Sequence, residues 1–177
     1  MTLALQSLVY EPLSEEHAIE LHNDFLDERL YHFIPEGPPR SLEALQREYA
    51  EFNAGAPAGS GEVWLNWAIR DGASGTCVGT LQATRFADGL LWVGYKIVPS
   101  AWGKGIATSA LSWLTGELFT KFDGQPLLAA VDTRNFSSIR VLEKCQFKLQ
   151  RKEPAELHGK QTEDFIFQYT GFQDRAA

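Results

Sequence analysis

The sequence is poor in cysteine and in long apolar runs. Only two of its 177 residues are cysteines, and Cys77 and Cys145 lie in apolar stretches without the spacing of a metal site or a redox motif. We interpret both as small core residues and expect neither a disulfide nor a metal site. No run of about eighteen apolar residues occurs, and the N-terminal MTLALQSLVY has no basic leader. These absences predict a cytoplasmic protein without a membrane partner.

An excess of basic residues is also absent. Lys and Arg number 16 against 23 Asp and Glu, which gives a formal net charge of -7. Proteins that bind nucleic acid draw most of their affinity from a basic surface, so we expect no nucleic-acid partner. The charge favours a cationic or amine-bearing partner, although solubility explains a modest negative charge equally well.

The rest of the composition is that of an ordinary globular chain. Hydrophobic residues make up 44% and charged residues 22% of the sequence, close to average usage. A chain of this length buries roughly 70% of the surface that it exposes when unfolded, so its core needs no covalent staple. The turn-rich residues 53–62 are too few to separate domains. We therefore predict one domain over residues 1–177.

Hydrophobic periodicity predicts helices first and a sheet afterwards. A short strand at residues 8–11 precedes two helices, which begin after Ser14 and Ser41; the first carries Ala18, Leu21, Phe25 and Leu26 on one face. The expected elements that follow are strands 62–70, 75–86 and 90–98, a helix to about Phe119, strand 126–131, helix 137–144 and strands 147–152 and 164–172. This order predicts an α/β (α+β) fold, with a mixed, mostly antiparallel sheet of six to seven strands flanked by about four helices.

Residues 100–108, SAWGKGIAT, join the third of these strands to a helix through a glycine loop. Free N–H groups at a helix N-terminus favour an anion, and glycine lets the backbone approach it closely. The Walker A pattern fails because Gly105 stands where Ser or Thr is required. The dinucleotide pattern has Thr108 at its third glycine, and its strand would have to be parallel. A plain turn, with Lys104 as a solvated charge, remains an alternative.

The loop resembles a signature of the GNAT superfamily of acyl-CoA-dependent N-acyltransferases, R/Q-x-x-G-x-G/A. SAWGKGIA matches both glycine positions, with Ser100 at the Arg/Gln position, and VDTRNFSSIRVLEKCQF follows about thirty residues later. Within the superfamily the two motifs resemble the branch of ribosomal-protein N-terminal acetyltransferases. The resemblance covers residues 62–172 by motif and the N-terminal helices by architecture only. It implies a GNAT-like fold and acetyl transfer from acetyl-CoA to a primary amine of a protein N-terminus, peptide or small molecule, by a monomer or homodimer.

The same resemblance implies which residues hold acetyl-CoA. Main-chain N–H groups of residues 102–107 would bind its pyrophosphate, and the strand that ends at Ile97 and Val98 would bind the pantetheine arm. The implied cofactor-binding residues are Ile97, Val98, Trp102, Gly103, Lys104, Gly105, Ile106, Ala107, Thr108 and Asn135. The Val98 N–H would also contact the developing oxyanion. Asn135 could equally cap a helix, and Ser138, the candidate general acid, could equally be an ordinary first-turn serine.

The resemblance does not identify the general base or the pocket that binds the acetyl-accepting amine. Trp92 stands where the resembled branch can place a glutamate, which leaves water, His22, His32, Glu62 or Asp88 as the base. Aromatic residues that could line the acceptor pocket are Tyr31, His32, Phe33, Trp64, Trp67, Trp92 and Phe165, of which we predict Tyr31, His32, Trp67 and Trp92. Arg134 and Lys144 could meet the CoA 3′-phosphate. A catalytically inactive CoA-binding sensor or interaction module is the alternative function.

Overall fold

A computed structural model describes residues 7–171, in which seven strands form one sheet. Their order across the sheet is β1-β2-β3-β4-β5-β7-β6, and only β4 and β5 are parallel neighbours. The strands are β1 (Leu8–Pro12), β2 (Val63–Asp71), β3 (Cys77–Arg85), β4 (Leu91–Ile97), β5 (Leu127–Asp132), β6 (Phe147–Leu157) and β7 (Lys160–Tyr169). The prediction of a mixed, mostly antiparallel sheet is confirmed.

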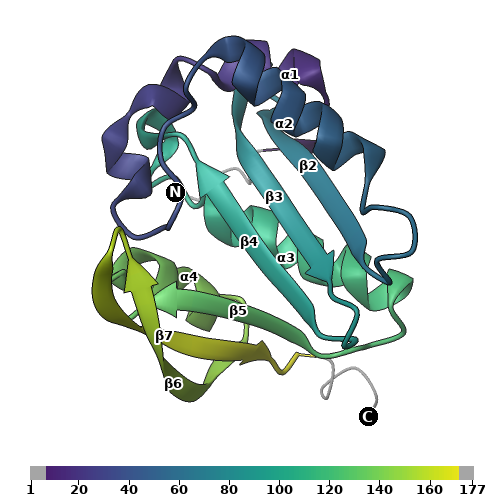
Figure 1. The fold of residues 1–177 in the computed structure, drawn as a ribbon, viewed down its shortest axis with the longest axis vertical. Helices are drawn as coiled ribbons and strands as arrows, with labels where there is room; N and C mark the ends of the chain where they lie inside the picture. Colours follow the sequence, from purple (N-terminus) through teal and green to yellow (C-terminus); the bar gives the residue numbers. More distant parts are fainter. Residues whose placement is uncertain (1–6, 172–177) are drawn as a thin grey trace.

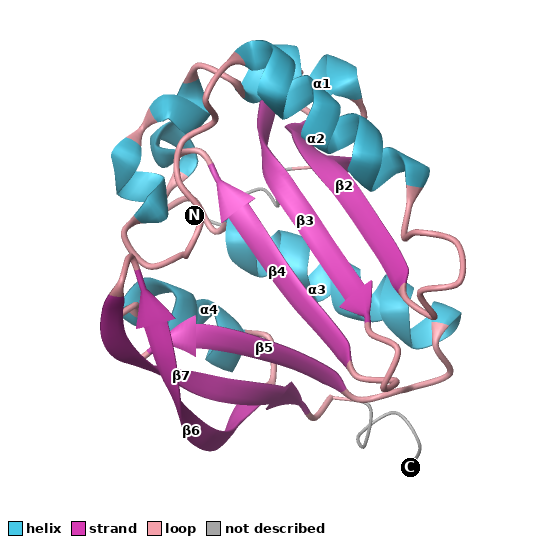
Figure 2. Cartoon of the chain, in the orientation of Figure 1, coloured by secondary structure: helices cyan, strands magenta, loops and turns pink. Residues whose placement is uncertain are grey.

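Helices cover both faces of this sheet (Figures 1 and 2). The α-helices are α1 (Glu15–Leu21), α2 (Leu42–Ala54), α3 (Ile106–Lys121) and α4 (Phe136–Lys144), and the 3-10 helices are η1 (Asp24–Leu26), η2 (Glu28–Tyr31) and η3 (Pro99–Ala101). Helices α1 and α2 pack together on the face of β2 and β3, α3 packs on the opposite face, and α4 packs on β6. No helix among residues 7–171 is both long enough and apolar enough to cross a membrane.

The central helix α3 shows why the sequence folds in this way. Its apolar side chains recur at helical spacing, and Leu111, Leu114 and Leu118 are at most 1% exposed against the sheet. Each buried leucine of this kind contributes about 1.5–3 kcal/mol relative to an exposed one. Cys77 and Cys145 are free and buried, as expected of small core residues. The helix that follows the glycine loop is therefore anchored in the hydrophobic core.

Helix α1 and the final hairpin differ most from the predicted elements. Helix α1 ends at Leu21, and Phe25 is buried from the 3-10 helix η1 instead, where Asn23 and Asp24 are residue types of low helix propensity. The final hairpin is longer than predicted: β6 runs to Leu157 and β7 begins at Lys160. The extra residues are mostly polar and exposed, so apolar alternation did not show them. Phe172, the predicted end of the last strand, lies outside the described residues.

Gln146, the residue before β6, adopts a left-handed backbone conformation with φ at 66°, which glycine adopts without strain. A side chain in this conformation costs about 1–2 kcal/mol. We expect Gln146→Gly to raise the free energy of unfolding by about 0.5–1 kcal/mol, after the greater entropy of glycine in the unfolded chain is subtracted. Urea denaturation measures the change. Gln146→Ala keeps a Cβ at the same φ, so an equal gain in that variant would contradict the explanation.

Candidate active site

Strands β4 and β5 pair at one end only and then diverge (Figure 1). Their parallel register consists of Leu91 opposite Leu127 and Trp92 opposite Leu128. Beyond Trp92, β4 has a partner only in β3. The side of β4 that faces β5 therefore offers unpaired main-chain groups to an extended molecule, which could add to it as a strand does.

The direction of each β4 amide follows from one hydrogen bond. The N–H of Val98 donates to the carbonyl oxygen of Val78 at 3.0 Å. Successive residues of a strand direct their main-chain groups to opposite sides, so Val93, Tyr95 and Ile97 direct theirs toward β5. The prediction of an oxyanion contact at Val98 is therefore wrong, because that N–H is already bonded to β3. The N–H of Ile97, one residue earlier, faces the opening.

The glycine loop continues from the end of β4 into α3. Gly103 has φ 73° and Gly105 has φ 79°, conformations that strain any residue with a side chain. The first helical hydrogen bond is donated by the N–H of Ser109 to Gly105, at 3.0 Å. The N–H groups of residues 103–108 thus have no acceptor among residues 7–171, and with the helix dipole they form an anion site.

Trp102, which the loop also contains, is used differently from the prediction that it binds the pyrophosphate. Its N–H donates to the carbonyl oxygen of Pro99 at 3.2 Å, and its indole Nε1 donates to the carbonyl oxygen of Ile97 at 2.7 Å. The guanidinium of Arg29 lies 5.7 Å from its ring centroid. Trp102 therefore holds the end of β4 to the loop, and its main-chain N–H is not free for a phosphate.

Two polar side chains at the start of α4, Asn135 and Ser138, form hydrogen bonds. The side-chain oxygen of Asn135 accepts from the N–H of Ser138 at 3.2 Å, which caps the helix. The Ser138 hydroxyl lies 2.8 Å from the phenol of Tyr95 on β4. Burial raises the pKa of Tyr95 to about 12, so this phenol keeps its proton at neutral pH. The geometry joins β4 to α4 through a pair of hydroxyl groups.

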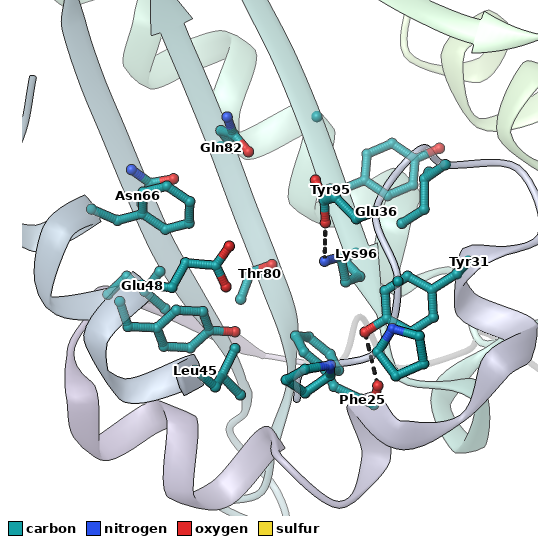
Figure 3. A pocket seen from close by; sticks show the side chains of 18 of the residues that line it. Phe25, Tyr31, Glu36, Leu45, Glu48, Asn66, Thr80, Gln82, Tyr95 and Lys96 are labelled. Carbon is teal, nitrogen blue, oxygen red and sulfur yellow. Dashed lines mark hydrogen bonds and ion pairs between the residues drawn. The ribbon is translucent and has the colours of Figure 1, made fainter. Parts of the chain in front are cut away.

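A cavity of about 440 Å³ lies on the other side of β4, beneath α1, α2 and the segment that joins them. Its floor includes Asn66, Thr80 and Gln82 from β2 and β3, together with Gly94 and Lys96 from β4 (Figure 3). Its α2 wall is formed by side chains at helical spacing: Ala44, Leu45, Glu48, Tyr49 and Phe52. The Tyr49 hydroxyl is buried and has no hydrogen-bond partner among the described residues. The cavity therefore has an apolar wall, a polar floor and one unsatisfied buried hydroxyl.

Glu48 is the carboxylate of this cavity that has no ion pair within residues 7–171. It is exposed, and its carboxyl group points into the cavity (Figure 3). The protein around it removes enough water to raise the pKa of this carboxyl, and Lys96 opposes the shift. A carboxylate with a raised pKa is a better proton acceptor near neutral pH.

The sequence of residues 7–148 matches the family model described as the acetyltransferase (GNAT) domain. The chain belongs to the GNAT acetyltransferase family. The superfamily resemblance predicted from the two motifs is thus confirmed, and the protein is an acetyltransferase. No curated protein matches the chain in sequence.

Solved structures of similar fold include several acetyltransferases. A GNAT-family acetyltransferase from Bacillus anthracis has a TM-score of 0.77 at 16% identity and covers 95% of this chain and 97% of its own. The ribosomal-protein-S5-alanine acetyltransferase from Vibrio fischeri has a TM-score of 0.76 at 18% identity, covering 95% of each chain. Spermidine N-acetyltransferase from Vibrio cholerae, in complex with CoA and spermine, has a TM-score of 0.74 at 16% identity and covers 91% and 94%. At these identities the likeness shows the fold.

Only one of the four predicted acceptor aromatics lines the cavity of the acetyltransferase. Tyr31 does, and its phenol donates to the carbonyl oxygen of Phe25 at 2.8 Å. Trp67 is on the opposite face of β2, because it follows Asn66, and it packs edge-on against Trp113 of α3 at 5.5 Å. Trp67 therefore does not line this cavity. His32 and Trp92 are not among the residues that line the cavity.

The predicted proton acceptors also lie elsewhere in the acetyltransferase. Glu62 accepts from the indole of Trp64 at 2.7 Å, beside a smaller pocket, and Asp88 accepts from a main-chain N–H in the turn before β4. Neither these carboxylates nor His22 and His32 line the 440 Å³ cavity. Arg134, a predicted phosphate contact, is bonded to Asp132 at 2.6 and 2.8 Å. Sequence reasoning missed Glu48, whose only signal was its helical spacing from Leu45 and Phe52.

Proposed function

We propose that this acetyltransferase moves an acetyl group from acetyl-CoA to a primary amine bound in the 440 Å³ cavity. The observation that carries the proposal is the position of β4. One edge of this strand is open toward β5, and one face, at Gly94 and Lys96, lines the cavity. Gly94 has no side chain, and a Cβ built on it would meet open space. Acetyl-CoA bound along the open edge of β4 and an amine bound in the cavity would thus meet at this strand.

The residues at the edge suit acetyl-CoA. The free N–H groups of residues 103–108 would bind its pyrophosphate, and the open edge of β4 would bind its pantetheine arm. The side-chain nitrogen of Asn135 remains available, since only its oxygen caps α4. Bound acetyl-CoA supplies an activated thioester. The Ile97 N–H would stabilise the negative charge that develops on the thioester oxygen.

Glu48 would remove the proton of the acceptor ammonium. An alkyl ammonium has a pKa of about 10.4, so it is protonated at neutral pH and cannot attack until it loses a proton. Glu48 is the unpaired carboxylate of the cavity, and its raised pKa matches this role. We propose it as the general base in place of the candidates named from the sequence.

Tyr95 and Ser138 would return a proton to the departing thiolate. Their hydroxyl groups lie 2.8 Å apart at the opening between β4 and α4. A neutral phenol can donate its proton to the thiolate and recover one from solvent through the serine hydroxyl beside it. The pair therefore extends the predicted general-acid role of Ser138 to Tyr95.

We expect Tyr95→Phe to lower kcat by about 10²-fold, the low end of the usual contribution of general-acid catalysis. KM for acetyl-CoA should change by less than about twofold. Ser138→Ala should lower kcat similarly, and the double variant should fall no further than the worse single variant, because the two hydroxyls act as one unit. Steady-state thiol release measures these values. Fully multiplicative losses would contradict a shared proton path.

The direct test of the function is thiol release from acetyl-CoA with a panel of peptides, small amines and polyamines. The proposal expects turnover with at least one primary amine and a mass increase of one acetyl group on that amine. Tight CoA binding without turnover on any acceptor would favour the alternative of a CoA-binding sensor. The similar structures include enzymes named for spermidine and for ribosomal proteins, so the fold alone does not choose the acceptor.

We also propose that residues 1–177 form one domain, because every strand from β1 to β7 joins one sheet. The buried free thiols of Cys77 and Cys145 fit a reducing compartment such as the cytoplasm. The working assembly would be a monomer or a homodimer, which light scattering distinguishes.

A further inference from the structure

The cavity contains a cation site that the protein fills with its own lysine. The ammonium of Lys96 lies 2.6 Å from a carboxylate oxygen of Glu36. The same nitrogen lies 5.2 Å from the ring centroid of Phe25 and 5.3 Å from that of Tyr31. A carboxylate with two aromatic rings is the usual recognition surface for an organic ammonium. We call Phe25, Tyr31 and Glu36 the cation cage.

The cage and Glu48 belong to one cavity. All four residues line it, and Figure 3 shows Glu36 and Lys96 on one side and Glu48 on the other. Lys96 and Glu36 each act on the pKa of the Glu48 carboxyl, so the charges interact. Arg40 also lines the cavity and adds a second positive charge. The charges of the lining therefore balance, with two acidic and two basic side chains.

This balance limits what the cavity accepts. A diamine or polyamine needs two anionic subsites. Of the two carboxylates in this cavity, Glu36 is already neutralised by Lys96 of β4. A second external ammonium would also be repelled by Lys96 and Arg40 at short range. One ammonium beside Glu48, attached to an uncharged body that packs on Leu45 and Phe52, meets neither obstacle.

We propose that Lys96 is a specificity-determining residue: by filling the cation cage it restricts the acceptor to compounds with a single cationic amine on an uncharged body and excludes diamines and polyamines. The inference rests on the proposed function, since it concerns the acceptor of that reaction. The proposal names one class of acceptor, whereas the fold is shared by enzymes named for different acceptors.

The test compares hexylamine, 1,6-diaminohexane and spermidine as acceptors. The wild-type protein should prefer hexylamine by at least about tenfold in kcat/KM. Lys96→Met keeps a long apolar stem against the two rings but vacates the carboxylate, so the preference should shift toward the diamine by about tenfold or more. Lys96→Arg retains the cation and should keep the wild-type preference. Adding Glu36→Gln to Lys96→Met should abolish the gain for the diamine.

Binding gives a second measurement that needs no turnover. Calorimetric titration of the same three amines into the CoA-saturated protein should show the same order of affinities and the same shift in Lys96→Met. A wild-type preference for spermidine, or an unchanged preference in Lys96→Met, would overturn the inference while leaving acetyl transfer intact. Absence of turnover with every amine would overturn the proposed function, and the titrations would still decide the role of Lys96.

Discussion

Glu48→Gln is expected to lower kcat/KM for the amine about 10³-fold, within the range that general-base catalysis contributes. Glutamine has nearly the same shape as glutamate and keeps the hydrogen-bonding oxygen, but it cannot take a proton. The acid limb of the pH profile should also change. In the wild-type protein the rate should rise with pH through the pKa of Glu48, which lies above its usual 4.5. In Glu48→Gln this limb should disappear.

The same substitution should raise the melting temperature at neutral pH. The folded-state pKa of Glu48 is raised, so the folded protein binds this proton more tightly than the unfolded chain does. The resulting stabilisation is present below the unfolded pKa and is lost as pH rises through the folded pKa. At pH 7.5 the wild-type protein therefore carries the cost of an ionised carboxyl, which Glu48→Gln removes, whereas at pH 4 the difference should shrink.

Glu51→Gln is the matched control for both measurements. Glu51 is exposed on α2 and is not among the residues that line the cavity. It should leave kcat/KM within about twofold of wild type and keep the acid limb, displaced slightly to lower pH because the Glu51 charge contributes to the raised pKa of Glu48. A rate loss in Glu51→Gln equal to that in Glu48→Gln would show that general changes of α2 charge, and not a proton acceptor, explain the result.

Local chemistry made the glycine loop and the second motif predictable from the sequence. The glycine loop before α3 and the possible cap at Asn135 follow from residue type and position, and the structure has both. The expected order of strands and helices was also sufficient to predict the class of sheet. These features depend on neighbours in the chain, which periodicity and turn chemistry describe well.

The sequence could not predict which face of β2 lines the cavity or which β4 amides point toward the open edge. Alternation says that Asn66 and Trp67 face opposite sides of β2, but it does not say which side holds the acceptor cavity. The same ambiguity of direction explains the prediction of an oxyanion contact at Val98, whose N–H is bonded to β3. Glu48 was missed for a related reason: a glutamate on an amphipathic helix is usually solvated, and only the packing of α2 over the sheet gives it a cavity.

Gly105→Val is expected to raise the dissociation constant of acetyl-CoA by about 10²-fold or more. Gly105 is the N-cap of α3, with φ 79° and ψ 3°, a conformation that a β-branched residue very rarely adopts. A Cβ there would meet nothing within 4 Å, so the cost is in the backbone and not in crowding. The chain would return to negative φ, which turns the N–H groups of residues 103–108 away from a common anion and removes the phosphate site.

Calorimetric titration with CoA measures this loss, and Gly116→Ala provides the control in the same helix. Gly116 lies within α3 at an ordinary φ, and a Cβ added to it would meet nothing within 4 Å. Alanine there should raise the free energy of unfolding by about 0.5–1 kcal/mol and leave the affinity for CoA unchanged. Valine cannot keep the positive φ of position 105 without strain. Wild-type affinity in a folded Gly105→Val variant would therefore mean that the pyrophosphate binds somewhere other than this loop.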